Sequence, residues 1–379
     1  MARIELKGLS HSYLRRPREA ADYALQPLDL EWKDGGAYAL LGPSGCGKTT
    51  LLNIISGLVR PSRGKVFFDG RDVTDLSPQQ RNIAQVFQFP VVYDTMTVAQ
   101  NLAFPLRNRG LGAEAIRKRV GQVAEMLELS GELDRRARGL TADAKQKISL
   151  GRGLVREDVA AVLFDEPLTV IDPHLKWQLR RKLKQIHREL KLTLVYVTHD
   201  QVEALTFADQ VMVMSEGRVV QAGTPEQLFE HPSHVFVGHF IGSPGMNFLP
   251  VSITDGVPRV AGEPLGGAAT EQLARWLAAQ QATSPQASLV LGIRPEYVRL
   301  AADGDAGTVD AVAERVQDLG TSMLITARVG SASIKVRAPV QTDLQTSLAA
   351  AGAAAAGRPL RLSVINSHSR FYRNENLIT

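Results

Sequence analysis

Short apolar runs alternate with stretches in which apolar residues recur every three or four positions, and this alternation fills the first part of the chain. The runs have the length of buried strands and occupy residues 37–41, 83–87, 159–164 and 192–197. After the first run, apolar residues recur at helical spacing at Leu51, Leu52, Ile54, Ile55 and Leu58. Strands that alternate with helices in this way predict an α/β fold around a mostly parallel sheet.

A second strand–helix–strand unit begins at residue 159. Asp172 and Pro173 open its helix, because aspartate caps helix N-termini and proline suits the first turn. The apolar stripe of this helix consists of Leu175, Leu179, Leu183, Ile186 and Leu190. The run at 192–197 follows, so the flanking strands should be parallel and joined by a right-handed crossover. A mostly helical pattern from about residue 98 to 155 predicts a helical insert, which we place at about residues 89–155.

The last third of the chain has a different pattern. Short strand-like segments, separated by glycine or polar turns, lie at residues 288–293, 323–329, 332–337 and 360–364. They predict a small β-barrel. The sequence Gly-Ser-Pro-Gly at 242–245 marks a linker. We therefore expect two domains, at residues 1–242 and 243–379.

Composition narrows the class of protein. A chain of 379 residues with 44% hydrophobic and 22% charged residues is typical of a globular protein with two or three domains. The single cysteine, Cys46, permits neither an internal disulfide nor a cysteine-based metal cluster. The net charge of +5 is spread over 44 basic and 39 acidic residues, which is too diffuse to argue for nucleic acid. Charged residues among the first seven argue against a signal peptide, so we expect a cytosolic protein.

One motif carries strong chemical information. The spacing G-x-x-x-x-G-K-T is formed by Gly42, Pro43, Ser44, Gly45, Cys46, Gly47, Lys48 and Thr49, between a predicted strand and a predicted helix. Its glycines allow the backbone N–H groups to surround phosphates, Lys48 can reach the outer phosphates, and the Thr49 hydroxyl can ligate Mg²⁺. We expect this loop, together with Thr50, to bind ATP.

Two carboxylates end the next buried strand of the sheet. Asp165 and Glu166 follow the apolar run at 159–164, where a parallel sheet presents its ligands. We expect Asp165 to hold Mg²⁺ and Glu166 to polarise the attacking water; a solvated pair of acids is the alternative. His199 follows the strand at 192–197 and could contact the γ-phosphate, although a lone histidine is usually structural or solvated.

Together these residues resemble the ATP-binding cassette family. The resemblance implies three catalytic residues: Gln88 as the Q-loop glutamine, which also contacts the metal, Glu166 as the catalytic glutamate and His199 as the switch histidine. It implies as well that Tyr13 stacks on adenine. The expected fold is a P-loop cassette with a mixed core sheet, an antiparallel β-subdomain and a helical subdomain. The segments at 240–247 and 292–296 resemble the junction and the OB-like regulatory domain of bacterial carbohydrate and polyol importers, so the resemblance covers nearly the whole chain.

The family's signature motif, Leu-Ser-Gly-Gly-Gln, departs from its pattern here. Its positions hold Leu140, Thr141, Ala142, Asp143 and Ala144. In the family this motif closes over ATP held by a second cassette. Thr141 keeps a hydroxyl for that contact, whereas Asp143 brings a negative charge toward phosphates unless its side chain turns away. We therefore predict a heterodimer with a second, non-identical ATPase chain. Thr169 and Asp172 preserve the chemistry of the family's D-loop.

The resemblance implies a subunit that energises an importer. The sequence around residues 140–155 is similar to that of one of the two ATPase subunits of bacterial glycerol importers, so glycerol is the favoured solute. The expected partners are two membrane permeases, a second ATPase and, indirectly, an external solute-binding protein, at the cytoplasmic face of the inner membrane. The alternatives are a homodimeric ATPase of a sugar or glycerol-3-phosphate importer, and a non-transport ATPase with a regulatory role.

Overall fold

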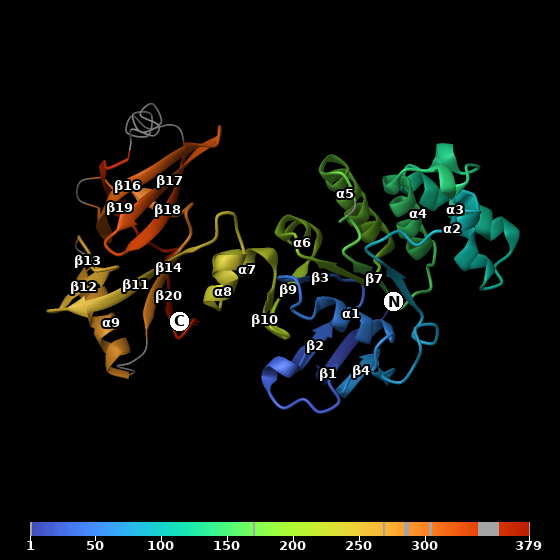
Figure 1. Cartoon of the computed structure of the whole chain (residues 1–379), viewed down its shortest axis with the longest axis horizontal. Helices are drawn as coiled ribbons and strands as arrows, with labels where there is room; N and C mark the ends of the chain where they lie inside the picture. Colours follow the sequence, from blue (N-terminus) through green and yellow to red (C-terminus); the bar gives the residue numbers. More distant parts are fainter. Residues whose placement is uncertain are drawn as a thin grey trace. The chain divides into compact units, whose positions relative to one another are not determined.

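The chain folds into two compact units (Figure 1). The computed structural model describes residues 2–169, 171–267, 270–283, 288–302, 305–339 and 356–378. Unit 1 comprises Met1–Pro225 and unit 2 comprises Glu226–Thr379. Each unit buries its own apolar cluster, so each is described by itself.

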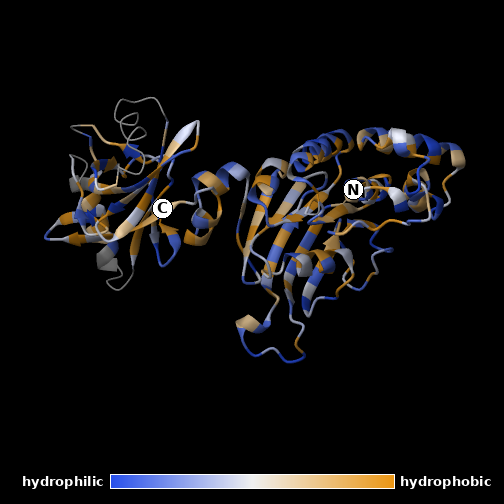
Figure 2. Cartoon of the chain, turned by 45° about the horizontal axis from the view of Figure 1, so that its top comes forward, coloured by the Kyte–Doolittle hydropathy of each residue, from blue (hydrophilic) through white to orange (hydrophobic). Residues whose placement is uncertain are grey.

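Unit 1 is built on a sheet with the strand order β10-β9-β3-β8-β7-β6. Its strands are β3 (Ala37–Leu41), β6 (Ile83–Val86), β7 (Ala161–Asp165), β8 (Leu194–Thr198), β9 (Gln210–Ser215) and β10 (Arg218–Gly223). Strands β6 to β9 and β3 are parallel, whereas the edge strand β10 pairs antiparallel with β9. Every residue of β3 and β8 is buried, as expected for parallel strands covered on both faces. Figure 2 shows the apolar residues concentrated in these strands.

The helices that flank this sheet are α1 (Lys48–Ser56), α5 (Pro173–Leu190) and α6 (Gln201–Phe207). The predicted strands at 37–41, 83–87, 159–164 and 192–197 are confirmed to within two residues. Strands β7 and β8 pair in parallel and are joined through α5, so the predicted strand–helix–strand unit is also confirmed. The sheet therefore places the residues after β3, β7 and β8 at one edge.

A second, antiparallel sheet with the order β2-β1-β4-β5 covers α1. Its elements are β1 (Ile4–His11), the short helix η1 (Ala20–Asp22), β2 (Leu25–Trp32), β4 (Arg63–Phe68) and β5 (Arg71–Asp72). One buried cluster joins this sheet to α1 and the central sheet through Leu6, Leu25, Ile54, Val66 and Val197. The antiparallel β-subdomain implied by the family resemblance is thus present.

Helices predominate between β6 and β7. They are α2 (Val98–Arg107), α3 (Ala113–Met126), η2 (Ser130–Glu132), η3 (Ala137–Gly139) and α4 (Ala142–Leu154). Thr97 and Gln100 form a capping box at the start of α2, and the Thr141 hydroxyl caps α4 by accepting a bond from Ala144 N. The helical insert predicted at about residues 89–155 corresponds to this segment.

Unit 2 consists mainly of two antiparallel sheets, with the strand orders β13-β12-β11-β14-β20-β21 and β15-β19-β16-β17-β18. The strands are β11 (Asn247–Thr254), β12 (Val257–Val260), β13 (Glu263–Pro264), β14 (Leu289–Ile293), β15 (Arg299–Leu300), β16 (Thr308–Asp318), β17 (Ser322–Val329), β18 (Ala332–Pro339), β19 (Pro359–Ser363), β20 (Arg370–Arg373) and β21 (Asn376–Ile378). The helices are α7 (Pro225–Glu230), α8 (Val235–Phe240) and α9 (Thr270–Thr283). The predicted strands at 288–293, 323–329, 332–337 and 360–364 correspond to β14, β17, β18 and β19.

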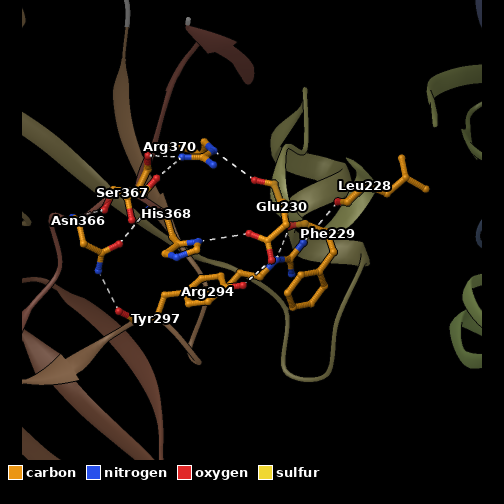
Figure 3. Close-up of polar contacts among 10 residues, drawn as sticks. Leu228, Phe229, Glu230, Arg294, Tyr297, Asn366, Ser367, His368 and Arg370 are labelled. Carbon is orange, nitrogen blue, oxygen red and sulfur yellow. Dashed lines mark hydrogen bonds and ion pairs between the residues drawn. The ribbon is translucent and has the colours of Figure 1, made fainter. Parts of the chain in front are cut away.

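The division between the units lies at Pro225, earlier than the boundary at residue 242 that the glycine-rich linker suggested. Arg294 explains the difference, because its buried guanidinium donates to the carbonyl oxygens of Phe229 and Ile241 at 2.7 and 2.6 Å. Glu230, at the end of α7, accepts bonds from Tyr297 OH and from the ring of His368 (Figure 3). These contacts join α7 and α8 to the β-rich part of unit 2.

Candidate functional site

The loop between β3 and α1 is shaped to surround an anion. Gly47 caps α1 at φ 101° and Gly45 lies at φ 80°, both in the left-handed region. A Cβ at Gly42 would lie 2.3 Å from the carbonyl oxygen of Met214, and a Cβ at Gly47 would lie 2.4 Å from that of Ala24. Packing therefore requires glycine at positions 42 and 47, and the left-handed backbone favours glycine at position 45. The first N–H groups of α1, which have no partner within the helix, lie next to this loop.

Lys48 lies inside this loop. It is buried, and its Nζ donates to the carbonyl oxygens of Gly42 and Pro43 at 2.8 and 2.9 Å. Cys46 is buried beside it, and burial raises the pKa of the Cys46 thiol. Cys46 is thus a small protonated side chain at neutral pH, while the Lys48 ammonium is positioned where phosphate oxygens would be its counter-ions.

Thr49 and Asp165 come together from different elements. Thr49 Oγ1, on the first turn of α1, donates to Asp165 Oδ1, at the end of β7, over 3.2 Å. Burial raises the pKa of the Asp165 carboxyl, and the bond from Thr49 offsets this only in part. A hydroxyl and a carboxylate at this distance match the oxygen ligands that Mg²⁺ prefers, so the residues fit the predicted metal.

Tyr13 and Thr50 also meet at the start of α1. The Tyr13 hydroxyl lies 3.3 Å from Thr50 Oγ1, and the Tyr13 and His11 rings pack at right angles. The Tyr13 side chain is 66% exposed. A mostly exposed aromatic ring beside the loop is compatible with the stacking on adenine that the resemblance implies.

Glu166 and His199 form a pair beside these groups. His199 Nδ1 lies 3.2 Å from Glu166 Oε2, which also accepts a bond from Thr169 Oγ1 at 3.3 Å. Glu166 has a φ of 46°, which is strained for a residue with a side chain, and its N–H donates to Val197 O at 3.0 Å. The structure therefore joins the ends of β7 and β8 through the two residues expected to act on the γ-phosphate.

Gln88 is less well defined by its contacts. It follows β6 and is half-buried, and in the described part of the chain its side chain forms no hydrogen bond to Thr49 or Asp165. The structure thus brings together Thr49, Asp165, Glu166 and His199, but it does not join Gln88 to them. The proposed metal contact of Gln88 stays a prediction.

The signature positions differ from the picture that led us to predict a heterodimer. Asp143 Oδ2 lies 3.5 Å from Lys147 Nζ, one turn further along α4, and Asp143 Oδ1 is buried. The charge is directed into its own subunit, so the repulsion expected toward a partner's phosphates loses its basis. Thr141 Oγ1 accepts the N–H of Ala144, which leaves its hydroxyl proton available as a donor.

Asp172 caps α5, as predicted, by accepting the His174 N–H at 2.9 Å. Its D-loop role stays a prediction, and the neighbouring Val170 lies outside the described residues.

One buried residue of this region, Gln146, was not identified from the sequence as part of the site. Gln146, fully buried on α4, donates its side-chain N–H groups to Pro167 O at 2.6 Å and to Phe87 O at 3.4 Å. It thereby links the helical insert to the residues that follow Glu166 and precede Gln88. In the sequence, Gln146 is a polar residue in a helix with a weak apolar stripe. Nothing in this pattern distinguishes it from a residue on the surface.

The fold and this site define the chain as a P-loop ATPase of the ATP-binding cassette class. Three family models match it: ABC transporter at residues 25–169, the MalK OB fold domain at 242–298 and the TOBE domain at 291–359. The chain belongs to the ATP-binding subunits of ABC transporters and carries MalK-type OB and TOBE domains. It is an ATP-binding and ATP-hydrolysing transport subunit, as predicted.

Similar proteins include the sn-glycerol-3-phosphate import ATP-binding protein UgpC of Escherichia coli O1:K1, which is 39% identical over 342 residues, covering 89% of this chain and 91% of that protein. UgpC of Salmonella typhimurium is 39% identical over 340 residues with the same coverage. Among solved structures, cbiO1 from Clostridium perfringens, part of the transporter complex cbiONQ, matches with a TM-score of 0.55 and 28% identity over 60% of this chain and 90% of that one. A dimeric post-hydrolysis structure of the cassette MJ0796 with ADP and phosphate matches with a TM-score of 0.52 and 28% identity over 59% of this chain and 98% of that one.

Proposed function

We propose that this chain hydrolyses MgATP to drive import of sn-glycerol-3-phosphate or a related polyol phosphate. The likeness to UgpC along nearly the whole chain, including the C-terminal domains, carries this proposal. It replaces the glycerol favoured by the sequence around residues 140–155 with the phosphorylated solute, one of the alternatives stated above.

The site residues divide the chemistry among them. Lys48 and the N–H groups of the loop bind the phosphates, and Tyr13 stacks on the base. Thr49 and Asp165 would hold Mg²⁺, which supplies charge neutralisation on the phosphates when bound. Glu166 accepts hydrogen bonds at Oε2 and is placed to orient the attacking water, while His199 keeps the carboxylate in position and donates toward the γ-phosphate.

The permease partners would dock on unit 1 near Gln88. Phe87, Phe89, Val91 and Tyr93 are exposed there. A groove of about 240 Å³ beside them is lined by residues of β6 and of the helical insert, among them Pro105 and Arg152. Exposed apolar side chains around a groove between two subdomains are suited to bind a helix of another subunit.

None of the helices in the described residues has the length and hydropathy of a membrane span. We propose that the chain is peripheral, at the cytoplasmic face of the inner membrane, with transport specificity supplied by the permeases and an external binding protein.

We further propose that two copies of this chain form the ATPase pair. The internal ion pair of Asp143 removes the physical reason for a second, different cassette, and the related cassette MJ0796 is described as dimeric. No comparison supports the heterodimer that we predicted from Ala142 and Asp143.

Uptake of labelled solutes tests the transport proposal. Cells that lack this chain should lose uptake of sn-glycerol-3-phosphate but not of glycerol, and the wild-type gene should restore it. Glu166→Gln should restore none, because loss of the group that orients water slows hydrolysis by about a hundredfold or more. Normal uptake of sn-glycerol-3-phosphate without the chain would overturn the proposed substrate, whereas normal uptake with Glu166→Gln would overturn the proposed catalytic role.

A further inference from the structure

A buried carboxylate lies directly behind the loop that carries His199. Glu203, in the first turn of α6, is only 4% exposed, whereas the His199 side chain is 54% exposed. No ion pair involves Glu203 among the residues that the structure describes. A buried carboxylate is costly to maintain, and the hydrolytic site does not use it directly.

The contacts of Glu203 lead to the backbone on both sides of His199. Its Oε2 accepts a bond from Thr198 Oγ1 at 2.8 Å and another from Tyr196 OH at 3.1 Å. Thr198 Oγ1 in turn accepts the N–H of Asp200 at 3.0 Å. The residues before and after His199 are thus tied to one carboxylate through a single hydroxyl.

The chemistry of these groups fixes the direction of the hydrogen bonds. A threonine hydroxyl has one proton, and a carboxylate can only accept, so Thr198 must donate to Glu203 and has its lone pairs left for the Asp200 N–H. Asp200 caps α6 by accepting the N–H groups of Val202 and Glu203. In this arrangement of the turn from β8 to α6, the Thr198 hydroxyl both donates and accepts, and His199 Nδ1 lies 3.2 Å from Glu166 Oε2.

We propose that Glu203 is a positioning residue for His199, acting through Thr198. The proposal rests on the proposed catalytic role of the Glu166–His199 pair. Without the carboxylate, the hydroxyl of Thr198 is free to rotate, and the His199 loop loses its fixed orientation toward Glu166. Because orientation contributes to the rate of the reaction rather than to binding of ATP, kcat should fall while KM for ATP stays close to wild type.

The experiment uses the purified full-length chain and two kinds of variant. Glu203→Leu and Thr198→Val break the connection, while Glu203→Gln and Thr198→Ser keep an acceptor and a hydroxyl. Tyr196→Phe is the matched control, since it removes the other bond to the same oxygen without touching the His199 loop. We expect kcat to fall roughly tenfold to a hundredfold in the first two variants, because the His199 side chain is misplaced. In Glu203→Gln and Thr198→Ser, kcat should be largely restored.

A second readout follows the His199 ring itself. Ring resonances of histidine-labelled protein, assigned with His199→Ala, should shift in Thr198→Val and Glu203→Leu but not in Tyr196→Phe. Where Glu203→Leu fails to fold, Thr198→Val decides, because it removes only a hydroxyl from a residue of nearly the same shape.

The outcomes separate this inference from the proposed function. If His199→Ala slows hydrolysis but folded Thr198→Val and Glu203→Leu do not, the positioning role is overturned. If His199→Ala itself hydrolyses ATP at the wild-type rate, the catalytic role of His199 fails, and the resonances alone then decide: unchanged ring signals in Thr198→Val overturn the positioning role, and shifted signals support it.

Discussion

At Asp165, stability and function oppose each other. Burial raises the pKa of this carboxyl, so the folded chain binds a proton more readily than the unfolded chain does. Stability therefore falls as pH rises from the ordinary aspartate range through the raised pKa. Asp165→Asn keeps an acceptor for Thr49 but carries no charge, and we expect it to raise Tm at neutral pH by about 2 °C in the absence of nucleotide and metal.

The gain should disappear as pH is lowered through the raised pKa of Asp165, because the wild-type carboxyl is then neutral too. Thermal unfolding of both proteins across this pH range measures it, and the same variant should lose Mg²⁺-dependent hydrolysis. An equal or lower Tm for Asp165→Asn at neutral pH would show that the buried charge costs nothing.

The proximity of site residues was predictable where a motif fixes both spacing and element, whereas their chemical roles stay predictions. Lys48, Thr49, Asp165 and Glu166 follow from the phosphate loop and from an apolar strand that ends in acids, and the structure brings Thr49 and Asp165 into contact. The buried position of Glu203 was not predictable, because its contact with Thr198 depends on the packing of α6 against β8. The orientation of Asp143 was left open by the sequence, which does not show that Lys147 pairs with its carboxylate or that one carboxylate oxygen is buried.

The position of α1 depends on a residue from outside the phosphate loop. Arg81 is buried, and its guanidinium donates to the carbonyl oxygens of Ile54 and Ile55, in the last turn of α1. It also binds the carbonyl oxygens of Thr74 and Leu76, and burial lowers its pKa to about 10. Arg81 therefore satisfies the C-terminal end of the helix whose N-terminal end faces the phosphates.

Arg81→Met should destabilise unit 1 by about 3 kcal/mol, because it leaves buried carbonyl groups without donors. Urea unfolding measures this. Arg60→Met is the control, since Arg60 is exposed and forms a surface ion pair with Asp75, and such pairs contribute little. Equal effects of the two substitutions would contradict the capping role of Arg81.

Elements were predictable from the sequence where burial is uniform on both faces. The parallel strands β3, β7 and β8 are apolar along most of their length, and α5 has a clear stripe. The antiparallel sheet was expected only through the family resemblance, because half of the β4 residues are exposed and β2 mixes buried and exposed positions. Helices α7 and α8 have six residues each, too few to show a period, so the sequence did not indicate their contacts within unit 2. The domain boundary at residue 242 stays a prediction.

At the scale of the whole molecule, the proposed pair of identical chains requires that the signature segment of one chain can close over ATP bound by the other. Glu166→Gln should bind MgATP without hydrolysing it, so two chains should close over the bound nucleotide and stay closed. The Thr141 hydroxyl can donate across such an interface, and Asp143 is engaged by Lys147 within its own chain.

Sedimentation velocity of the purified Glu166→Gln chain should therefore show a monomer alone and a dimer with MgATP. Adding Lys48→Ala should abolish the dimer, because the phosphates then lose their buried cation. Adding Asp143→Asn instead should leave the dimer unchanged, because the carboxylate is already paired with Lys147 and does not face the partner's phosphates. A chain that binds MgATP and stays monomeric, but dimerises once Asp143 is neutralised, would restore the case for a second, different cassette, since the charge would then be acting outward after all.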